Sequence, residues 1–219
     1  MINISGQILP IKKIGAMAHA KGIQVIVDGA HAFAHIQYDI DDLNCDYYAA
    51  SLHKWLSTPL GAGLLYVRKD NIHKVWPLLA DGEKDKNKIN RLNHTGTHPV
   101  HTDLTINDSI DYYEMIGAER KEARLRYLQN YWTEKVRNFP RIILNTPGEA
   151  NRSCAIANVG IEGIAPADLA KRLLKEHKIF TVAIDYANIR GCRICPNLYT
   201  TTNELDVFVS ALKTLATSS

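Results

Sequence analysis

The chain has 219 residues, 46% of them hydrophobic, and its 26 basic and 23 acidic residues give a formal net charge of +3. That apolar content is ample for a buried core, and the dispersed charges form no polybasic tract that would indicate a nucleic-acid or membrane partner. No apolar run approaches the roughly 20 residues that span a bilayer, and the first residues, MINISGQILPIKK, lack the apolar core of a signal peptide. We therefore expect a cytoplasmic globular protein whose partners are small soluble molecules.

The first third of the chain alternates helix and strand signals. Apolar residues at helical spacing follow Pro10, and Gly22 stands where this helix would end. Three short runs with the composition of strands come next, IQVIVDGAH, CDYYAAS and GAGLLYVRKD. This order predicts part of a layered α/β domain, in which ligands gather at the carboxyl ends of strands.

A polar loop and a pair of helices follow. Residues 81–98 are polar and contain glycine, which predicts an exposed loop. Residues 104–137 have helical spacing, and we expect two helices that break near Gly117. The sequence therefore divides into an α/β part, residues 1–103, and a second part, residues 104–219, with the linking helices and a smaller domain.

The smaller domain begins with two strand-like runs, RIILNT and SCAIANVGI, and a helix with Asp168 near its start. Two more strands, IFTVAI and GCRICP, precede a closing helix for which Asn203 is the expected cap. This order indicates a small α+β domain. The chain carries four cysteines, too few and too scattered for a disulfide framework, so we expect reduced thiols. Cys192 and Cys195 lie three apart in a predicted strand and would point to opposite faces, which disfavours a shared metal or disulfide.

Asp28 and Lys54 each follow a predicted strand. A carboxylate and an amine in one pocket suit a Schiff-base enzyme, because the amine condenses with an aldehyde and the carboxylate keeps a pyridine nitrogen protonated. The residues alone equally allow a simple turn at Asp28-Gly29 and a solvated strand end at Lys54. The Schiff-base pair and the simple turn with a solvated lysine are therefore both compatible with these residues.

A metal-dependent hydrolase is a rival from a different class. His94, His98 and His101 have a spacing that would place three imidazoles on one helical face, and such spacing can make a zinc site. Gly96 and Pro99 interrupt this stretch, which disfavours a helix there.

Four stretches together resemble the class V aminotransferase family of pyridoxal-phosphate (PLP) enzymes. They are VIVDGAHAFAH, CDYYAASLHKWLSTPLGAGLLYVR, HTGTHP and CRICPNLYTTTNELDVFVSAL, in the family's order and at similar spacing. The isopenicillin N epimerase-like members are the nearest by these motifs, and the cysteine desulfurases come next. The resemblance implies PLP fold type I, with a three-layer α/β large domain followed by a small α+β domain.

The resemblance also implies roles for individual residues. Lys54 would form the Schiff base with PLP, Asp28 would pair with the pyridine nitrogen, and His31 would bind the ring hydroxyl. Ser51 and His53 match the positions that contact the cofactor phosphate, where a hydroxyl and an imidazole suit an anion.

Two further positions imply a partner and a substrate. Gly96 and Thr97 match a motif that reaches the cofactor phosphate of the neighbouring subunit, which implies a homodimer. Arg193 matches the arginine that binds the carboxylate of an amino-acid substrate, a task suited to a planar bidentate donor. The implied function is PLP-dependent chemistry at the α carbon of an amino acid.

Two departures from the family qualify this function. The connection AIDYANIRGCRIC has no cysteine in its loop, which disfavours persulfide chemistry, although a C–S lyase or cysteine desulfurase remains an alternative. The resemblance begins in the middle of the family's large domain, at INISGQILPI. We therefore expect a fragment that alone binds PLP weakly or not at all. A non-catalytic remnant that serves as a binding or dimerisation module is the further alternative.

Overall fold

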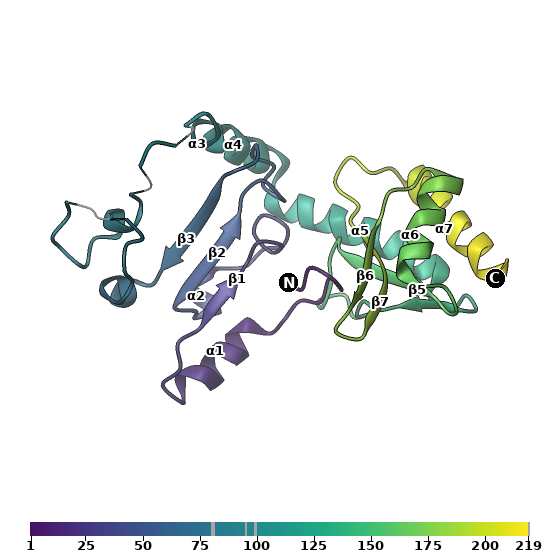
Figure 1. Ribbon diagram of the computed structural model, residues 1–219, viewed down its shortest axis with the longest axis horizontal. Coiled ribbons are helices and arrows are strands. Elements are labelled where there is room, and N and C mark those ends of the chain that lie inside the picture. The colour runs from purple at the N-terminus through teal and green to yellow at the C-terminus, as the bar shows by residue number, and fades with distance from the viewer. Residues whose placement is uncertain (80–81, 95, 99, 219) are drawn as a thin grey trace. The chain divides into compact units, whose positions relative to one another are not determined.

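The computed structural model describes residues 1–79, 82–94, 96–98 and 100–218. The chain forms two compact units (Figure 1). The first, Pro10–Ile116, is called the Lys54 unit below. The second, Met1–Leu9 together with Gly117–Ser219, is called the Arg193 unit.

The boundary between the units differs from the predicted one. The chain passes from one unit to the other between Ile116 and Gly117, not between residues 103 and 104. The segment after residue 103 belongs to the Lys54 unit, where the neighbouring Thr102 donates a hydrogen bond from its hydroxyl to the carbonyl oxygen of Leu60. Gly117 has a φ of +86°, a conformation that glycine adopts without strain, and it separates two helices as the sequence predicted.

The N-terminal residues belong to the Arg193 unit because hydrogen bonds hold them there. The hydroxyl of Thr146 donates to the carbonyl oxygen of Ser5 at 2.7 Å, and the amide of Ile8 donates to the carbonyl oxygen of Arg152 at 2.8 Å. The prediction had assigned residues 1–9 to the α/β part, because contacts with residues more than a hundred positions away leave no local signal.

The Lys54 unit is built on a three-stranded sheet in the order β1-β2-β3 (Figure 1). Its strands are β1 (Ile26–Asp28), β2 (Tyr47–Ser51) and β3 (Gly63–Val67). β1 and β2 are parallel, and β3 pairs antiparallel with β2. Helix α1 (Ile11–His19) precedes them and begins directly after Pro10, as predicted.

One face of this sheet carries the unit's core. Val27 and Tyr48 are buried there against α1 and the short helix α2 (Ile40–Leu43). On the opposite face, Ile26 is 71% exposed and Leu65 is 52% exposed. The described part of the Lys54 unit therefore shows the sheet and one helical layer of the predicted three-layer arrangement.

Regular structure occurs within the predicted exposed loop, residues 81–98. It contains the short 3-10 helix η2 (Ile89–Leu92), in which Arg91 is buried and donates hydrogen bonds to the carbonyl oxygens of Ile72 and Val75. Asp81 and Thr95 of this loop lie outside the described residues. A buried arginine in a polar stretch cannot be recognised from local composition, which is why the sequence indicated a loop alone.

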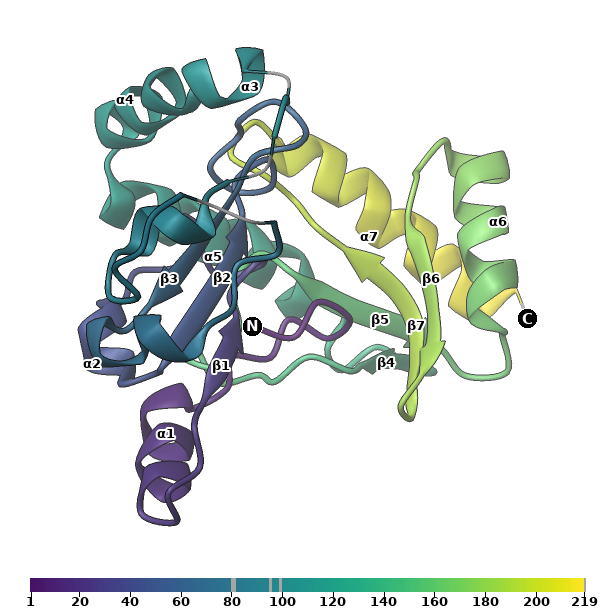
Figure 2. The ribbon, with the colours of Figure 1, turned by 60° about the vertical axis from the view of Figure 1, so that its left-hand side comes forward.

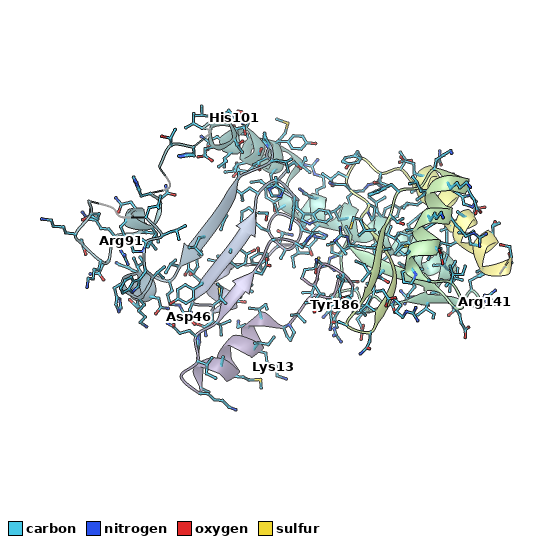
Figure 3. All side chains as sticks on the ribbon, viewed as in Figure 1. Lys13, Asp46, Arg91, His101, Arg141 and Tyr186 are labelled. Atoms are coloured by element: carbon cyan, nitrogen blue, oxygen red, sulfur yellow. The ribbon has the colours of Figure 1, made fainter. Side chains whose placement is uncertain are left out.

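Three more helical segments complete the unit. They are η1 (Lys69–Lys74), α3 (His101–Leu104) and α4 (Ile106–Ile116). His101 is the first residue of α3 (Figure 3).

The Arg193 unit has a four-stranded antiparallel sheet in the order β4-β5-β7-β6, with three long helices (Figure 2). Its elements are α5 (Ala118–Val136), β4 (Ile142–Leu144), β5 (Ala157–Ile161), α6 (Pro166–His177), β6 (Val182–Tyr186), β7 (Ile189–Ile194) and α7 (Thr202–Thr217). Trp132, Val159, Leu173 and Leu212 are fully buried and join helices and strands in one core. These elements confirm the small α+β arrangement.

The start of α7 corrects the predicted cap. Thr201, not Asn203, is the N-cap, and its hydroxyl accepts a hydrogen bond from the amide of Glu204 while the Glu204 carboxylate accepts one from the amide of Thr201. This reciprocal capping box outcompetes Asn203, which lies inside the first turn. Asp168 does lie in the first turn of α6. Within the described ranges, no helix is both long and apolar enough to cross a bilayer.

A buried carboxylate, Asp46, ties α1 to the start of β2 (Figure 3). His19 contacts it at 2.7 Å, and the amide of Val25 and the side chain of Asn71 donate to it at 2.7 Å and 2.9 Å. Burial alone would raise the pKa of Asp46, but these hydrogen bonds outweigh it and lower the pKa below its usual value. The ionised form of Asp46 therefore stabilises the folded unit.

Replacing Asp46 with alanine should lower the free energy of unfolding at pH 7 by about 3 kcal/mol, because three polar groups lose their buried partner. Since the folded-state pKa is depressed, the stabilisation is present above the unfolded-state pKa and is lost as pH falls through the folded-state value. Urea unfolding from pH 7 to pH 3 should show the two proteins converging below about pH 4. Asp42→Ala is the matched control, since Asp42 is exposed and pairs with exposed Lys12. Equal losses in both variants would contradict the prediction.

Candidate active site

Asp28 and Lys54 follow neighbouring parallel strands. Asp28 ends β1 and lies opposite Ala49 of β2, and the amide of Gly29 donates to the carbonyl oxygen of Ala49 at 2.7 Å. Because side chains alternate along a strand, Asp28 and Ser51 lie on the same face of the sheet as exposed Ile26. The carboxyl ends of both strands therefore meet at one edge, as the sequence predicted.

The neighbour of Lys54 is a histidine. The amine nitrogen Nζ of Lys54 lies 3.2 Å from the ring nitrogen Nε2 of His31, which is on the turn after β1. Asp28 is exposed, and its Oδ1 accepts a hydrogen bond from the amide of Ala30 at 3.0 Å. In the described part of the chain, no ion pair or hydrogen bond joins Asp28 to Lys54. The structure thus brings His31 and Lys54 together and keeps the Asp28 carboxylate available at the same edge.

Two buried rings that the sequence analysis did not single out hold this pair. His35 donates from Nδ1 to the carbonyl oxygen of His31 at 2.8 Å, and its ring stacks on that of Trp55, with centroids 3.6 Å apart and planes at 23°. Both side chains are buried, at 1% and 6% exposure. Since Trp55 directly follows Lys54, the stack connects the His31 turn to the Lys54 turn. The spacing of His31 and His35, four residues apart in HAFAH, was the available signal.

The turn after Asp28 is fixed by a tyrosine. Tyr48 is 1% exposed, and its hydroxyl donates to the carbonyl oxygen of Gly29 at 3.3 Å and also contacts the hydroxyl of Tyr38. A Cβ atom at Gly29 would lie 1.8 Å from the Tyr48 hydroxyl oxygen. Glycine at this position is therefore required by close packing.

Ser51 and His53, the predicted phosphate contacts, lie at the end of β2 and on the turn that follows. Ser51 is half-buried and pairs with Gly63 of β3. The Nδ1 atom of His53 is buried and has no hydrogen-bond partner among the residues described. An orphaned polar atom beside Lys54 is what a missing ligand would leave.

Gly96 and Thr97 are exposed, and Gly96 has a φ of +69°. Within the described ranges, no hydrogen bond or ion pair connects either residue to the Lys54 turn. Their predicted role in a neighbouring subunit stays a prediction.

The histidine-rich stretch forms no metal cluster within the part of the chain that is described. His98 Nε2 lies 3.2 Å from a carboxylate oxygen of Asp103, while His101 lies on α3. Pro99, which was expected to interrupt a helix here, lies outside the described residues.

Arg193 lies on β7 of the Arg193 unit, opposite Asn158 of β5 and Val182 of β6. Its Nη1 donates to the carbonyl oxygen of Asn3 at 3.4 Å, and its Nε is buried with no hydrogen-bond partner among the described residues. The guanidinium also contacts the thiol of Cys195, and its unused Nε can donate a hydrogen bond to a carboxylate.

The connection between β6 and β7 is a two-residue turn. Ala187 and Asn188 have φ values of +52° and +65°, the left-handed pair that closes a tight hairpin. This turn leaves no room for a loop that carries a nucleophile. The sequence prediction of a short connection is confirmed.

All four cysteines are free, and burial raises the pKa of each thiol. The pKa of Cys154 reaches about 12. Cys195 is an exposed residue overall, yet its thiol is surrounded closely enough that burial raises its pKa, and neighbouring Arg193 offsets this only in part. A raised pKa reduces the thiolate fraction, so none of these thiols is activated as a nucleophile.

Residues 1–207 match the family described as aminotransferase class V. The chain belongs to this family. Among curated class V relatives, the chain is 30% identical over 96% of its length to a protein of Xylella fastidiosa named probable cysteine desulfurase. It is 28% identical over 98% of its length to the isopenicillin N epimerase of Streptomyces clavuligerus. Both names were the ones that the sequence motifs indicated.

Solved structures show the same fold. The cysteine desulfurase of Thermococcus onnurineus superposes with a TM-score of 0.86 over 99% of this chain, at 23% identity. A cysteine desulfurase of Escherichia coli superposes with a TM-score of 0.83, at 21% identity. The predicted α/β fold of the class V family is therefore confirmed.

The chain spans a little over half the length of these class V proteins. It covers 54% of the Xylella fastidiosa protein, and 58% of both the epimerase and the Thermococcus onnurineus structure. The activity of such a whole protein is therefore a matter of proposal for this chain.

Proposed function

We propose that this chain provides the cofactor lysine and the substrate arginine of a PLP-dependent enzyme that acts at the α carbon of an amino acid. The observation that carries the proposal is the Lys54 amine, held 3.2 Å from His31 Nε2 at the edge where β1 and β2 end, in a chain of the class V family. A lysine at a solvated strand end would not require a histidine nitrogen within 3.2 Å of its amine.

The residues at this edge fit PLP by their chemistry. Lys54 provides the amine that binds an aldehyde, and Asp28 provides a carboxylate with acceptor capacity left for a protonated ring nitrogen. His53, with its buried unpartnered nitrogen, and Ser51 provide polar groups for a phosphate. When bound, PLP supplies an electron-withdrawing ring that stabilises negative charge at the α carbon.

The chain's own groups then account for binding and proton transfer. Arg193 holds the substrate carboxylate through the guanidinium donors that the fold leaves available. Lys54 Nζ removes the proton from the α carbon as a general base, and His31 Nε2, at 3.2 Å, shares that proton. Lysine and histidine side chains both serve as proton-transfer groups in enzymes.

A homodimer is part of the proposal. Gly96 and Thr97 are exposed, which suits a segment that reaches the cofactor phosphate of a neighbouring subunit. A hydroxyl and backbone amides at an exposed glycine turn are suitable anion ligands.

Epimerase-like or transaminase chemistry is favoured over persulfide chemistry. The two-residue turn between β6 and β7 carries no cysteine, and the raised pKa of each thiol makes it a poor nucleophile. The second candidate is a C–S lyase or cysteine desulfurase, which the names of the relatives favour. A lyase that does not use a cysteine nucleophile is compatible with these thiols.

Trapping the cofactor tests the proposal. The purified chain is incubated with increasing PLP, reduced with borohydride, and mapped by peptide mass spectrometry. Lys54 should be labelled at lower PLP concentrations than exposed Lys13 (Figure 3), since its neighbours favour the bound aldehyde. Labelling of Lys54 no greater than that of Lys13 would favour a non-catalytic remnant or binding module.

A further inference from the structure

The Arg193 unit contains a cavity of about 580 Å³ within its own residues. Its lining comes from the end of β7, the residues that precede and begin β6, and the first half of α7. Its walls are mainly apolar and include Phe180, Val182, Ile194, Leu205 and Phe208. This volume lies in the range of small-molecule sites, about 300–1,000 Å³.

Several polar groups are among the residues that line this cavity. Arg193 contributes its buried Nε, and His177 contributes its buried Nε2. Neither atom has a hydrogen-bond partner among the described residues. Lys178 adds a second cation. Glu204 also lines the cavity, but its carboxylate is occupied by the amide and hydroxyl of Thr201 in the capping box. The available charge therefore favours an anion.

Apolar surface continues to the mouth of the cavity. Phe180 is 77% exposed and Val207 is 55% exposed, and both line the cavity. Burying the exposed part of an aromatic side chain and its neighbour contributes to binding in proportion to the apolar area removed from water. A ligand with an apolar body is thus favoured over a small hydrophilic anion.

We propose that this cavity binds a carboxylate with a large apolar side chain, aromatic or long aliphatic, with the carboxylate on Arg193 and the side chain between Phe180 and Phe208. The inference rests on the proposed function for the statement that this ligand is the amino-acid substrate. It narrows that substrate to a class with an apolar side chain. It also assigns to Phe180 a role in specificity.

The test uses the purified chain without PLP and 3-phenylpropanoate as the probe. This carboxylate lacks an amino group and cannot condense with PLP. Binding is measured by chemical-shift titration in ¹H–¹⁵N NMR spectra, with 3-phenylpropanamide and acetate as comparison ligands. The amide keeps the apolar body without the charge, and acetate keeps the charge without the body.

Two variants are paired with controls from the same sheet. Arg193→Gln should weaken 3-phenylpropanoate binding by at least about tenfold, because a charge-assisted hydrogen bond is lost. Arg190→Gln, on the same strand but exposed and paired with Asp185, should leave it unchanged. Phe180→Ala should weaken binding about fivefold, whereas Tyr186→Ala, at the exposed end of β6 (Figure 3), should not.

Saturable binding of 3-phenylpropanoate that depends on Arg193 and Phe180 supports the inference. It is overturned if no saturable binding occurs, if the amide or acetate binds as well, or if the controls lose as much as the test variants. If the Arg193→Gln variant does not fold, the Phe180→Ala variant, which changes an exposed side chain, provides the test of the inference. This binding experiment contains no PLP, so a negative result does not bear on the labelling of Lys54. The cavity proposal and the proposed PLP function can therefore fail independently.

Discussion

Replacing Lys54 with alanine should abolish covalent labelling of the 50–67 segment by PLP and borohydride. No other amine in this segment can replace it, since Lys54 is its one lysine. In an assembled enzyme, exchange of the substrate's α proton with solvent should fall by about 10²- to 10⁴-fold, the usual contribution of a positioned general base. Labelling is read by peptide mass spectrometry and exchange by ¹H NMR in D₂O.

Two further variants make the result specific. Lys54→Arg keeps a cation near His31 but cannot form the covalent bond, so labelling should be lost with little change in stability. Lys69→Ala, an exposed lysine in the same unit, should label as the unchanged protein does. The assignment of Lys54 would be wrong if Lys54 in the unchanged protein were labelled no more than neighbouring lysines such as Lys69, and those lysines were labelled equally in all variants. PLP would then react with surface amines alone.

The sequence predicted that Asp28 and Lys54 follow neighbouring strands, but not which side chains they contact. Strand periodicity and the parallel order of β1 and β2 were enough to place Asp28 and Lys54 at one edge. The contact between Lys54 and His31 depends on two turns that meet through the stacked rings of His35 and Trp55. Such a contact is tertiary, and no spacing rule between residues 31 and 54 encodes it.

The fold shows the same division between local and tertiary signals. The break at Gly117 and the helix after Pro10 were predicted because they depend on the residues themselves. The cap of α7 was wrong by two positions, because Thr201 and Glu204 satisfy each other's backbone and Asn203 has no such partner. The N-terminal residues were assigned to the other unit because the Ser5 to Thr146 contact is remote in sequence.

Gly29→Ala should destabilise the Lys54 unit by about 1–3 kcal/mol, the usual cost of overpacking a core, and should also greatly reduce labelling of Lys54. Gly29 has no positive φ, so the backbone itself accepts alanine. The obstacle is Tyr48, whose Oη and Cζ would lie 1.8 Å and 1.9 Å from the new Cβ. Tyr48 is buried, so relief requires a shift of the strand end that carries Asp28.

A second substitution separates this steric cause from a general effect of alanine at a turn. Tyr48→Leu removes the atoms that the Cβ would meet, so the double variant should lose less stability than the sum of the two single changes. Gly82→Ala is the control, since a Cβ at Gly82 would meet no atom of the described residues within 4 Å. Additive losses in the double variant would mean that Tyr48 does not set the position of the turn. In that case Asp28 would owe its place at the sheet edge to the strand pairing of Gly29 with Ala49 alone.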